Sequence, residues 1–348
     1  MKGIQVSSYI PSPDLLQVTD LPDLQPSPTH YLIKISAAGT NFFDLLQIAG
    51  KYQHQPPLPW ISGSEFAGTV VAVPTSPSKS GKPWRFKVGD RVFGANQGAY
   101  ATQIYAPEPS LLPIPASWSF RDAAGLYVTA PTAYTALVTR AQTQPGEWVL
   151  VHAGAGGVGL SAVQFAKALG ATVIATASTD RKRQICLDFG ADYVIDYRSP
   201  KWPDQVIEIC KTHRTGNGKA GVDVVYDPVG MIGPSLKCVA WNARLLVIGF
   251  AAGKIEKLAL NRVLLKNVSV IGLHLGEYAK KEPQTTVVVW KAIFDLIQQK
   301  KFRSIVFGDR KFVGLDSVKD ALKALGERGT WGKVVCDIDD ADSQKARL

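Results

Sequence analysis

A glycine-rich segment is the first part of the chain whose residue types and spacing could do chemistry. Gly154, Gly156 and Gly159 form a G-x-G-x-x-G pattern between an apolar run at 147–151, which predicts a strand, and the run LSAVQFAKALG, which predicts a helix. In such a unit the first glycine allows a tight turn, the second lets backbone approach a pyrophosphate, and the third lets helix and strand pack closely. The helix start then offers N–H groups to the phosphates. The segment predicts a dinucleotide site; the alternative is a turn whose glycines serve packing alone.

The residues after the next predicted strand bear on which dinucleotide is bound. An NAD site places an acid about 20 residues past the first glycine, to bind the ribose 2′-OH. No acid lies at 174–178, and Ser178 is followed by Arg181, Lys182 and Arg183. A carboxylate would repel a 2′-phosphate, whereas a hydroxyl and a cation would bind it. The pattern predicts an acid-free, cationic pocket that selects NADPH over NADH, although at least one of the three cations is expected to be only a solvated residue of a helix start.

Alternating strands and helices position this site. Strands are predicted at 147–151, 171–177, 192–197, 222–227, 244–250 and 267–275, with helices between them at 181–191, 203–213 and 234–241. Apolar strands alternating with helices predict a parallel sheet covered on both faces.

The rest of the chain has a different pattern. The first 125 residues hold short strand-like runs at 31–40, 66–73 and 90–96, separated by Pro, Gly and Ser, which is typical of a small barrel. The C-terminal part predicts helices in 285–301 and 316–327, a short strand near 304–310 and a last strand at 332–338. The pattern alone leaves open whether this part extends the parallel sheet or returns to the first domain.

Bulk properties narrow the class of protein. The 348 residues carry a net charge of +10, which favours phosphorylated ligands or acidic surfaces, but the basic residues form only short clusters. The four cysteines form no C-x-x-C pair and predict buried, reduced thiols. No apolar run approaches the roughly 18 residues of a membrane span, and the start has no signal-peptide core. We expect a cytoplasmic protein, with Ala346-Arg347-Leu348 either a relaxed peroxisomal signal or an ordinary tail.

Several motifs resemble one known family along essentially the whole chain. They are GTNFFDLLQIAGKYQHQPPLPWISGSEFAGTVVAV (39–73), VGDRVFG (88–94), TAPTAYTAL (129–137), the glycine segment and IDYRS (195–199). The resemblance is to the zinc-free quinone oxidoreductase branch of the medium-chain dehydrogenase/reductases, the group that contains zeta-crystallin. It implies an α/β fold in which a GroES-like β-barrel domain (1–125) precedes a doubly wound Rossmann domain (126–276), and 277–348 returns to the first domain. It also implies a homodimer through the 267–275 edge strand.

The resemblance implies an NADPH-dependent reductase that transfers hydride to quinones or α,β-unsaturated carbonyls. Zinc-dependent relatives carry G-H-E where this chain has Gly63-Ser64-Glu65, and a Cys near Ala38-Gly39, so no metal is expected. The rival class is an NADPH-binding protein whose main role is to bind RNA or a partner. A third class, a structural protein that keeps the cofactor without turnover, also stays open.

The resemblance carries site residues over one by one. Asn41 and Tyr52 match catalytic positions of the family. Some relatives carry a second tyrosine two residues after the acid that matches Asp44, where this chain has Leu45-Leu46. The positions that match cofactor contacts are Thr132, Gly154, Gly156, Gly157, Val158, Gly159, Ser178, Lys182, Tyr197, Gly249, Phe250 and Lys333. The plainer alternatives are a wall residue for Tyr52, a turn residue for Asn41 and a strand-end aromatic for Tyr197. Asp44, Glu65 and His152 are expected to be structural.

Overall fold

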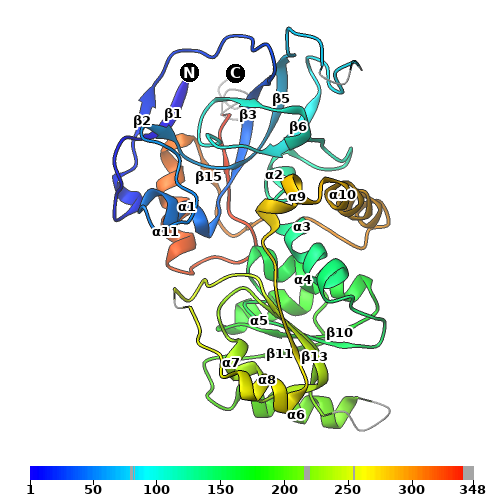
Figure 1. Ribbon diagram of the computed structural model, residues 1–348. Coiled ribbons are helices and arrows are strands. Elements are labelled where there is room, and N and C mark those ends of the chain that lie inside the picture. Colours follow the sequence, from blue (N-terminus) through cyan, green and yellow to red (C-terminus); the bar gives the residue numbers. More distant parts are fainter. Residues whose placement is uncertain (79–80, 82, 215–219, 254, 340–348) are drawn as a thin grey trace. The chain divides into compact units, whose positions relative to one another are not determined.

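The computed structural model describes residues 1–78, 81, 83–214, 220–253 and 255–339, and the C-terminal tripeptide lies outside these residues. The chain divides into two compact units, one of 1–128 with 304–348 and one of 129–303 (Figure 1). By this division residues 277–303 lie with the second unit, whereas the predicted returning segment began at 277. The binding roles of the two units stay a prediction.

The second unit is built on a six-stranded sheet in which every neighbouring pair is parallel. The strand order is β11-β10-β9-β12-β13-β14. All residues of β9 and β12 are buried, as expected of strands covered on both faces. The strands are β9 (Trp148–Val151), β10 (Thr172–Thr176), β11 (Tyr193–Ile195), β12 (Val222–Asp227), β13 (Val239–Val247) and β14 (Ser269–Gly272).

Helices cover this sheet on both sides. On one side Trp202 and Val206 of α6 and Ile232 of α7 join a core with the strand residues Leu150, Ile174 and Val225. Helix α4 packs on β9 and β10, and α3 packs on α4 (Figure 1). The helices are α3 (Thr129–Tyr134) continued by a π-helix (Thr135–Arg140), α4 (Gly157–Ala168), α5 (Asp180–Asp188), α6 (Trp202–His213), α7 (Ile232–Ser235), α8 (Leu260–Lys266), α9 (Tyr278–Lys281) and α10 (Pro283–Gln298), with a 3₁₀ turn at Leu275–Glu277. The predicted doubly wound sheet is confirmed.

The predicted helix at 234–241 is wrong. The helix α7 ends at Ser235, and β13 begins at Val239, which pairs with Val222 of β12. The register between these strands shifts between Val222 and Val224, and Asn242 of β13 has a φ of 64°. The irregular strand lies where β12 offers a partner, so sheet pairing overrides the helix-like local pattern.

The first unit is dominated by antiparallel sheets. A sheet of order β15-β16-β3-β5-β6-β8, with β7 also on β3, packs with a three-stranded sheet, β2-β1-β4, around one apolar core. The C-terminal strand β16 pairs with β3, about 300 residues earlier in the chain (Figure 1). The strands are β1 (Lys2–Val6), β2 (Val18–Asp20), β3 (Tyr31–Gly39), β4 (Trp60–Ile61), β5 (Glu65–Ala72), β6 (Arg91–Ala95), β7 (Gln103–Ala106), β8 (Leu111–Pro113), β15 (Phe312–Val313) and β16 (Val335–Asp337).

Within the described part of the first unit lie three short α-helices: α1 (Phe42–Ile48), α2 (Phe120–Ala124) and α11 (Val318–Gly326). Three 3₁₀ turns lie at Pro13–Leu15, Glu108–Ser110 and Leu315–Ser317. Within the region predicted as strand and loop, α1 was not expected. All four cysteines of the chain are free and buried, as predicted. Among the described residues, no helix is long and apolar enough to cross a membrane.

Candidate functional site

The glycine segment forms the turn between β9 and α4. A Cβ on Gly154 would lie 2.8 Å from Cβ of Ala175, and one on Gly159 would lie 2.3 Å from the carbonyl oxygen of Ala153, so both glycines are needed for close packing. A Cβ on Gly156 would meet nothing nearer than 3.3 Å. Gly156 is the N-cap of α4, and apart from the Ala153 carbonyl oxygen no heavy atom of the described residues beyond its chain neighbours would lie within 4 Å of that Cβ, so backbone there can approach a ligand. This arrangement fits a pyrophosphate, with Gly157 and Val158 in the first turn of the helix.

The carboxyl ends of the parallel strands bring the other predicted cofactor positions of this unit to one edge of the sheet. Ser178 follows β10, Tyr197 follows β11, and Gly249 and Phe250 follow β13. Phe250 is 41% exposed and Gly249 lies against the Pro228 carbonyl. Thr132 lies in α3 and is half-buried.

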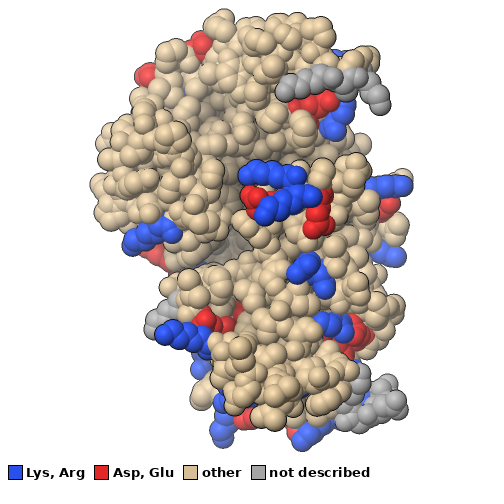
Figure 2. Space-filling model, in the orientation of Figure 1, with Lys and Arg blue, Asp and Glu red and all other residues tan. Residues whose placement is uncertain are grey.

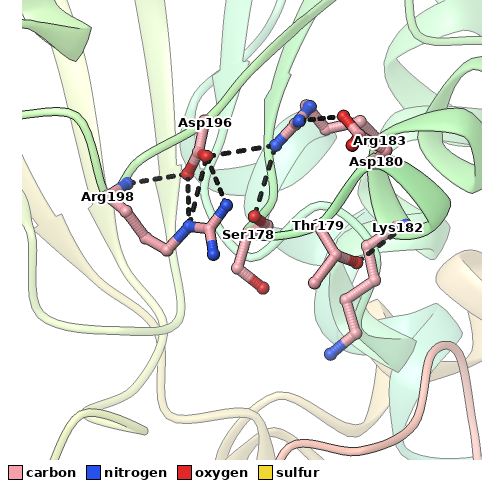
Figure 3. Close-up of polar contacts among 7 residues, drawn as sticks. All are labelled: Ser178, Thr179, Asp180, Lys182, Arg183, Asp196 and Arg198. Atoms are coloured by element: carbon pink, nitrogen blue, oxygen red, sulfur yellow. Dashed lines mark hydrogen bonds and ion pairs between the residues drawn. The ribbon is translucent and has the colours of Figure 1, made fainter.

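The surroundings of Ser178 differ from the sequence prediction in one respect (Figure 3). Asp196, just past β11, accepts from Arg198 Nη2 at 2.6 Å and pairs with Arg183 Nη1 at 3.3 Å. The prediction of an acid-free pocket is therefore wrong, because β10 and β11 are adjacent and parallel and their ends meet. The acid stands near the end of the strand predicted at 192–197, in the IDYRS motif, a signal from which it could have been found.

Helix α5 positions Lys182 and Arg183, two of the three basic residues that follow Ser178. Thr179 is its N-cap, and the Thr179 hydroxyl accepts from the Lys182 backbone N–H at 3.2 Å. Arg183 turns back, donating to the Ser178 carbonyl at 3.3 Å and pairing with Asp180. In Figure 3 the Lys182 ammonium and the Ser178 hydroxyl are directed to the same side, away from Asp196. The role of Ser178 and Lys182 in binding a phosphate stays a prediction, with both side chains directed to one side.

His152 lies just past β9 and is fully buried. Its Nδ1 is 3.1 Å from the Thr176 hydroxyl and its Nε2 is 2.8 Å from the Ser235 hydroxyl. Ser235 donates to the Met231 carbonyl, so its oxygen accepts from Nε2–H. Burial lowers the pKa of His152 to about 3, so the ring is neutral. The prediction of a satisfied structural histidine is confirmed.

In the first unit, Asn41 is the N-cap of α1, and its side chain belongs to a buried polar group. Lys333 Nζ is 2.6 Å from Asn41 Oδ1 and 2.6 Å from Glu65 Oε2. Asn41 Nδ2 donates to Glu65 Oε2 at 3.2 Å, and the other Glu65 oxygen accepts from the Val128 N–H at 3.0 Å. Because Lys333 can only donate, the Asn41 carbonyl must face it and the amide orientation is fixed. Lys333 was predicted to contact a cofactor. In the structure its ammonium binds Asn41 and Glu65, which lie in the same unit.

Beside this group, Asp44 and two tyrosines form a second cluster. Asp44 Oδ2 accepts from the Asn41 N–H at 2.8 Å and from the Tyr100 hydroxyl at 2.6 Å. Burial raises the pKa of Asp44 to about 6. Tyr52 is half-buried and stacks on Phe43 with ring centroids 5.4 Å apart. Burial, and then the charge of Asp44, raise the pKa of Tyr52, so its hydroxyl keeps its proton and can donate it.

The resemblance places Ala38-Gly39 and Ser64 where zinc-dependent relatives carry a Cys and a His, and these residues offer neither a thiolate nor an imidazole. A Cβ on Gly39 would lie 2.3 Å from the Ala124 carbonyl oxygen, so a larger residue does not fit there without a shift. Among the described residues, no three His, Cys, Asp or Glu side chains gather as a metal site.

Comparisons with known proteins agree on a family. A sequence model described as zinc-binding dehydrogenase matches residues 157–292, and one for the alcohol dehydrogenase GroES-like domain matches 27–116. A quinone oxidoreductase-like protein 2 homolog of Nematostella vectensis is 35% identical over 87% of this chain and 80% of its own length. Two similar solved structures are complexes with NADPH. A mycobacterial protein has a TM-score of 0.85 at 32% identity, covering 97% of this chain and 99% of its own. Quinone oxidoreductase of Escherichia coli has a TM-score of 0.84 at 30% identity, covering 97% and 100%.

Proposed function

Because the chain belongs to the quinone oxidoreductase branch of the medium-chain dehydrogenase/reductase superfamily, we propose that it is an NADPH-dependent reductase of quinones or α,β-unsaturated carbonyls. One observation carries the proposal. The open Gly156 at the start of α4 and the hydroxyl and cations around Ser178 follow two neighbouring parallel strands, β9 and β10. Such an edge binds a dinucleotide whose ribose is phosphorylated. Bound NADPH supplies the hydride.

The chain's own residues hold and polarise the acceptor. Lys333 and Glu65 fix the Asn41 amide with its carbonyl engaged, so the second N–H of Nδ2 is the group that remains to donate to an acceptor oxygen. The protonated Tyr52 hydroxyl is a second donor. The hydrogen bonds from both donors become stronger when the acceptor oxygen gains negative charge during hydride transfer. Ala38, Gly39 and Ser64 support a zinc-independent reaction.

The test combines binding with turnover. Fluorescence titration with NADPH and NADH should give much tighter binding of NADPH. Absorbance of the reduced cofactor should then fall with members of a panel of ortho-quinones and short enones, and the preferred member separates quinone reduction from double-bond reduction. Equal affinity for NADH, or no binding of either cofactor, would contradict the proposal. Binding without turnover on any acceptor would favour the class that keeps the cofactor for another role.

A homodimer through β14 is part of the proposal. The strand is the last in the sheet order, so one edge has no neighbour among the described strands. In helix α8, which directly precedes β14 in the chain and contacts β13, Leu260, Leu264 and Leu265 are 76%, 77% and 73% exposed. An unpaired edge and exposed leucines are features that a second copy would cover. Light scattering of the purified chain measures the expected twofold mass.

The rival role in RNA binding has little support on the visible surface. On the face drawn in Figure 2, Lys and Arg form separate small groups, several of them beside Asp or Glu. Salt-sensitive RNA binding that NADPH displaces would support that role. A peroxisomal address in the C-terminal tripeptide stays a prediction.

A further inference from the structure

The carboxylate of Asp196 is the centre of the ion pairs at the ends of β10 and β11 (Figure 3). Arg198 binds it side-on: Nε is 3.0 Å from Oδ1, and Nη2 is 2.6 Å from Oδ2. The Arg198 backbone N–H adds a third bond to Oδ1 at 3.0 Å. Arg183 reaches the same carboxylate from α5, with Nη1 at 3.3 Å. Asp196, just past β11, therefore pairs with two cations, one from helix α5 and one from the turn that follows β11.

The two arginines differ in what they leave available. Arg183 donates to Asp180, Asp196 and the Ser178 carbonyl, and its side chain is only 20% exposed. Arg198 has Asp196 as its side-chain partner among the described residues, and its side chain is 59% exposed. The side-on pair uses the Nε and Nη2 edge and leaves Nη1. In Figure 3 that nitrogen is directed to the side to which the Ser178 hydroxyl and the Lys182 ammonium point.

From this arrangement we propose that Arg198 is a specificity-determining residue for the phosphorylated ribose, and that Asp196 is the residue that positions it. The inference rests on the proposed NADPH site and adds to it two residues that the family motif did not assign. A guanidinium with a free edge is well suited to phosphate oxygens. The acid at this place then raises the preference for NADPH, the reverse of the usual effect of an acid near a ribose.

The charges of the cluster allow this role. Lys182, Arg183 and Arg198 face Asp180 and Asp196, which leaves one net positive charge. Hydrogen bonds from Arg198 hold the pKa of Asp196 well below its ordinary value, so the Asp196 carboxylate that positions Arg198 stays ionised through the neutral range. A long exposed side chain that is already ordered loses less conformational entropy when it binds.

The experiment measures dissociation constants for NADPH and NADH by fluorescence titration, in the full-length wild type and in three single variants. Arg198→Ala should weaken NADPH binding roughly 10- to 100-fold, the range for a charge-assisted hydrogen bond, and leave NADH within about twofold. Asp196→Ala decides between two mechanisms. If Asp196 positions Arg198, its loss should weaken NADPH binding by about 2- to 10-fold. If Asp196 acts only as a negative charge, its removal would tighten NADPH binding. Lys211→Ala, which removes an exposed cation from α6, is the charge-matched control and should change neither constant.

A double variant keeps the positioning role distinct from a structural one. In the Arg198→Ala background, Asp196→Ala should cause no further loss, because the residue it positions is gone. Thermal unfolding curves of all variants show whether each is folded. An unchanged NADPH/NADH ratio in Arg198→Ala, or tighter NADPH binding by Asp196→Ala, would overturn the inference while leaving the proposed function intact. A wild type that binds no NADPH would overturn the proposed function itself, and this inference with it.

Discussion

Replacing Lys333 by Met tests the buried group that orients Asn41. The Lys333 side chain is 4% exposed and its partner Glu65 is 0% exposed, and their charged atoms lie 2.6 Å apart. Without the ammonium, the Glu65 carboxylate stays buried with only the Val128 N–H and the Asn41 amide as donors. Breaking a buried pair from one side costs about 3–5 kcal/mol, because the remaining charge is uncompensated.

Calorimetry at pH 7 measures the effect. For a unit of this size each kcal/mol shifts the melting temperature by about 2–4 °C, so Lys333→Met should lower it by roughly 6–20 °C. The matched control is Lys323→Met, since Lys323 is 48% exposed and its pair with Asp14 lies on the surface. A pair of that kind contributes about 0–1 kcal/mol.

A double variant separates the charge effect from lost packing. Glu65→Gln together with Lys333→Met removes both charges and should recover much of the stability that Lys333→Met loses. The reasoning is refuted if Lys333→Met melts no lower than Lys323→Met, or if the double variant is less stable than Lys333→Met alone. Turnover should stay low in the double variant, because the Asn41 carbonyl has lost the donor that fixes it.

Three further predictions address other parts of the chain. Unfolded His152 takes up a proton near pH 6.5 while the buried ring does so only near 3, so its contribution to stability is complete above 6.5 and falls by about 2 kcal/mol at pH 5. Between pH 7.5 and 5 the wild type should lose more stability than His152→Gln in urea titrations, and equal losses would exclude this coupling. Gly159→Ala should unfold the site or destabilise it by several kcal/mol, since its Cβ would lie 2.3 Å from a carbonyl oxygen. Gly156→Ala should destabilise the fold less, since its Cβ would lie 3.3 Å from such an oxygen, and should lose NADPH affinity. Circular dichroism and cofactor titration measure both, and a stable Gly159→Ala would contradict the packing role. Leu264→Lys together with Leu265→Lys should yield a monomer by light scattering, and an unchanged dimer would place the interface elsewhere.

The sequence predicted those features whose cause is local. The glycine spacing in 154–159 and the apolar runs of β9, β10 and β12 reflect contacts within a strand–turn–helix unit or burial of a whole strand. These patterns are enough for the doubly wound sheet and for the dinucleotide site. The prediction at 234–241 was wrong because Val239 takes its conformation from β12, a partner that the local pattern does not contain.

Only the tertiary structure decided how distant residues combine. Asp196 pairs with Arg183 because β10 and β11 are neighbours in the sheet, and Lys333 meets Asn41 across 292 positions of sequence because β16 pairs with β3. A single sequence shows which residues can ionise, but the charge that each one compensates depends on which strands are paired. The chain by itself therefore determined a Rossmann-type nucleotide site and its family. Strand pairing set the partners of Asn41 and the approach of Arg183 to Asp196, since ion pairs and buried hydrogen bonds act over a few ångströms in space regardless of separation along the chain. The pair of Arg198 with Asp196 is local, because the two residues are two positions apart.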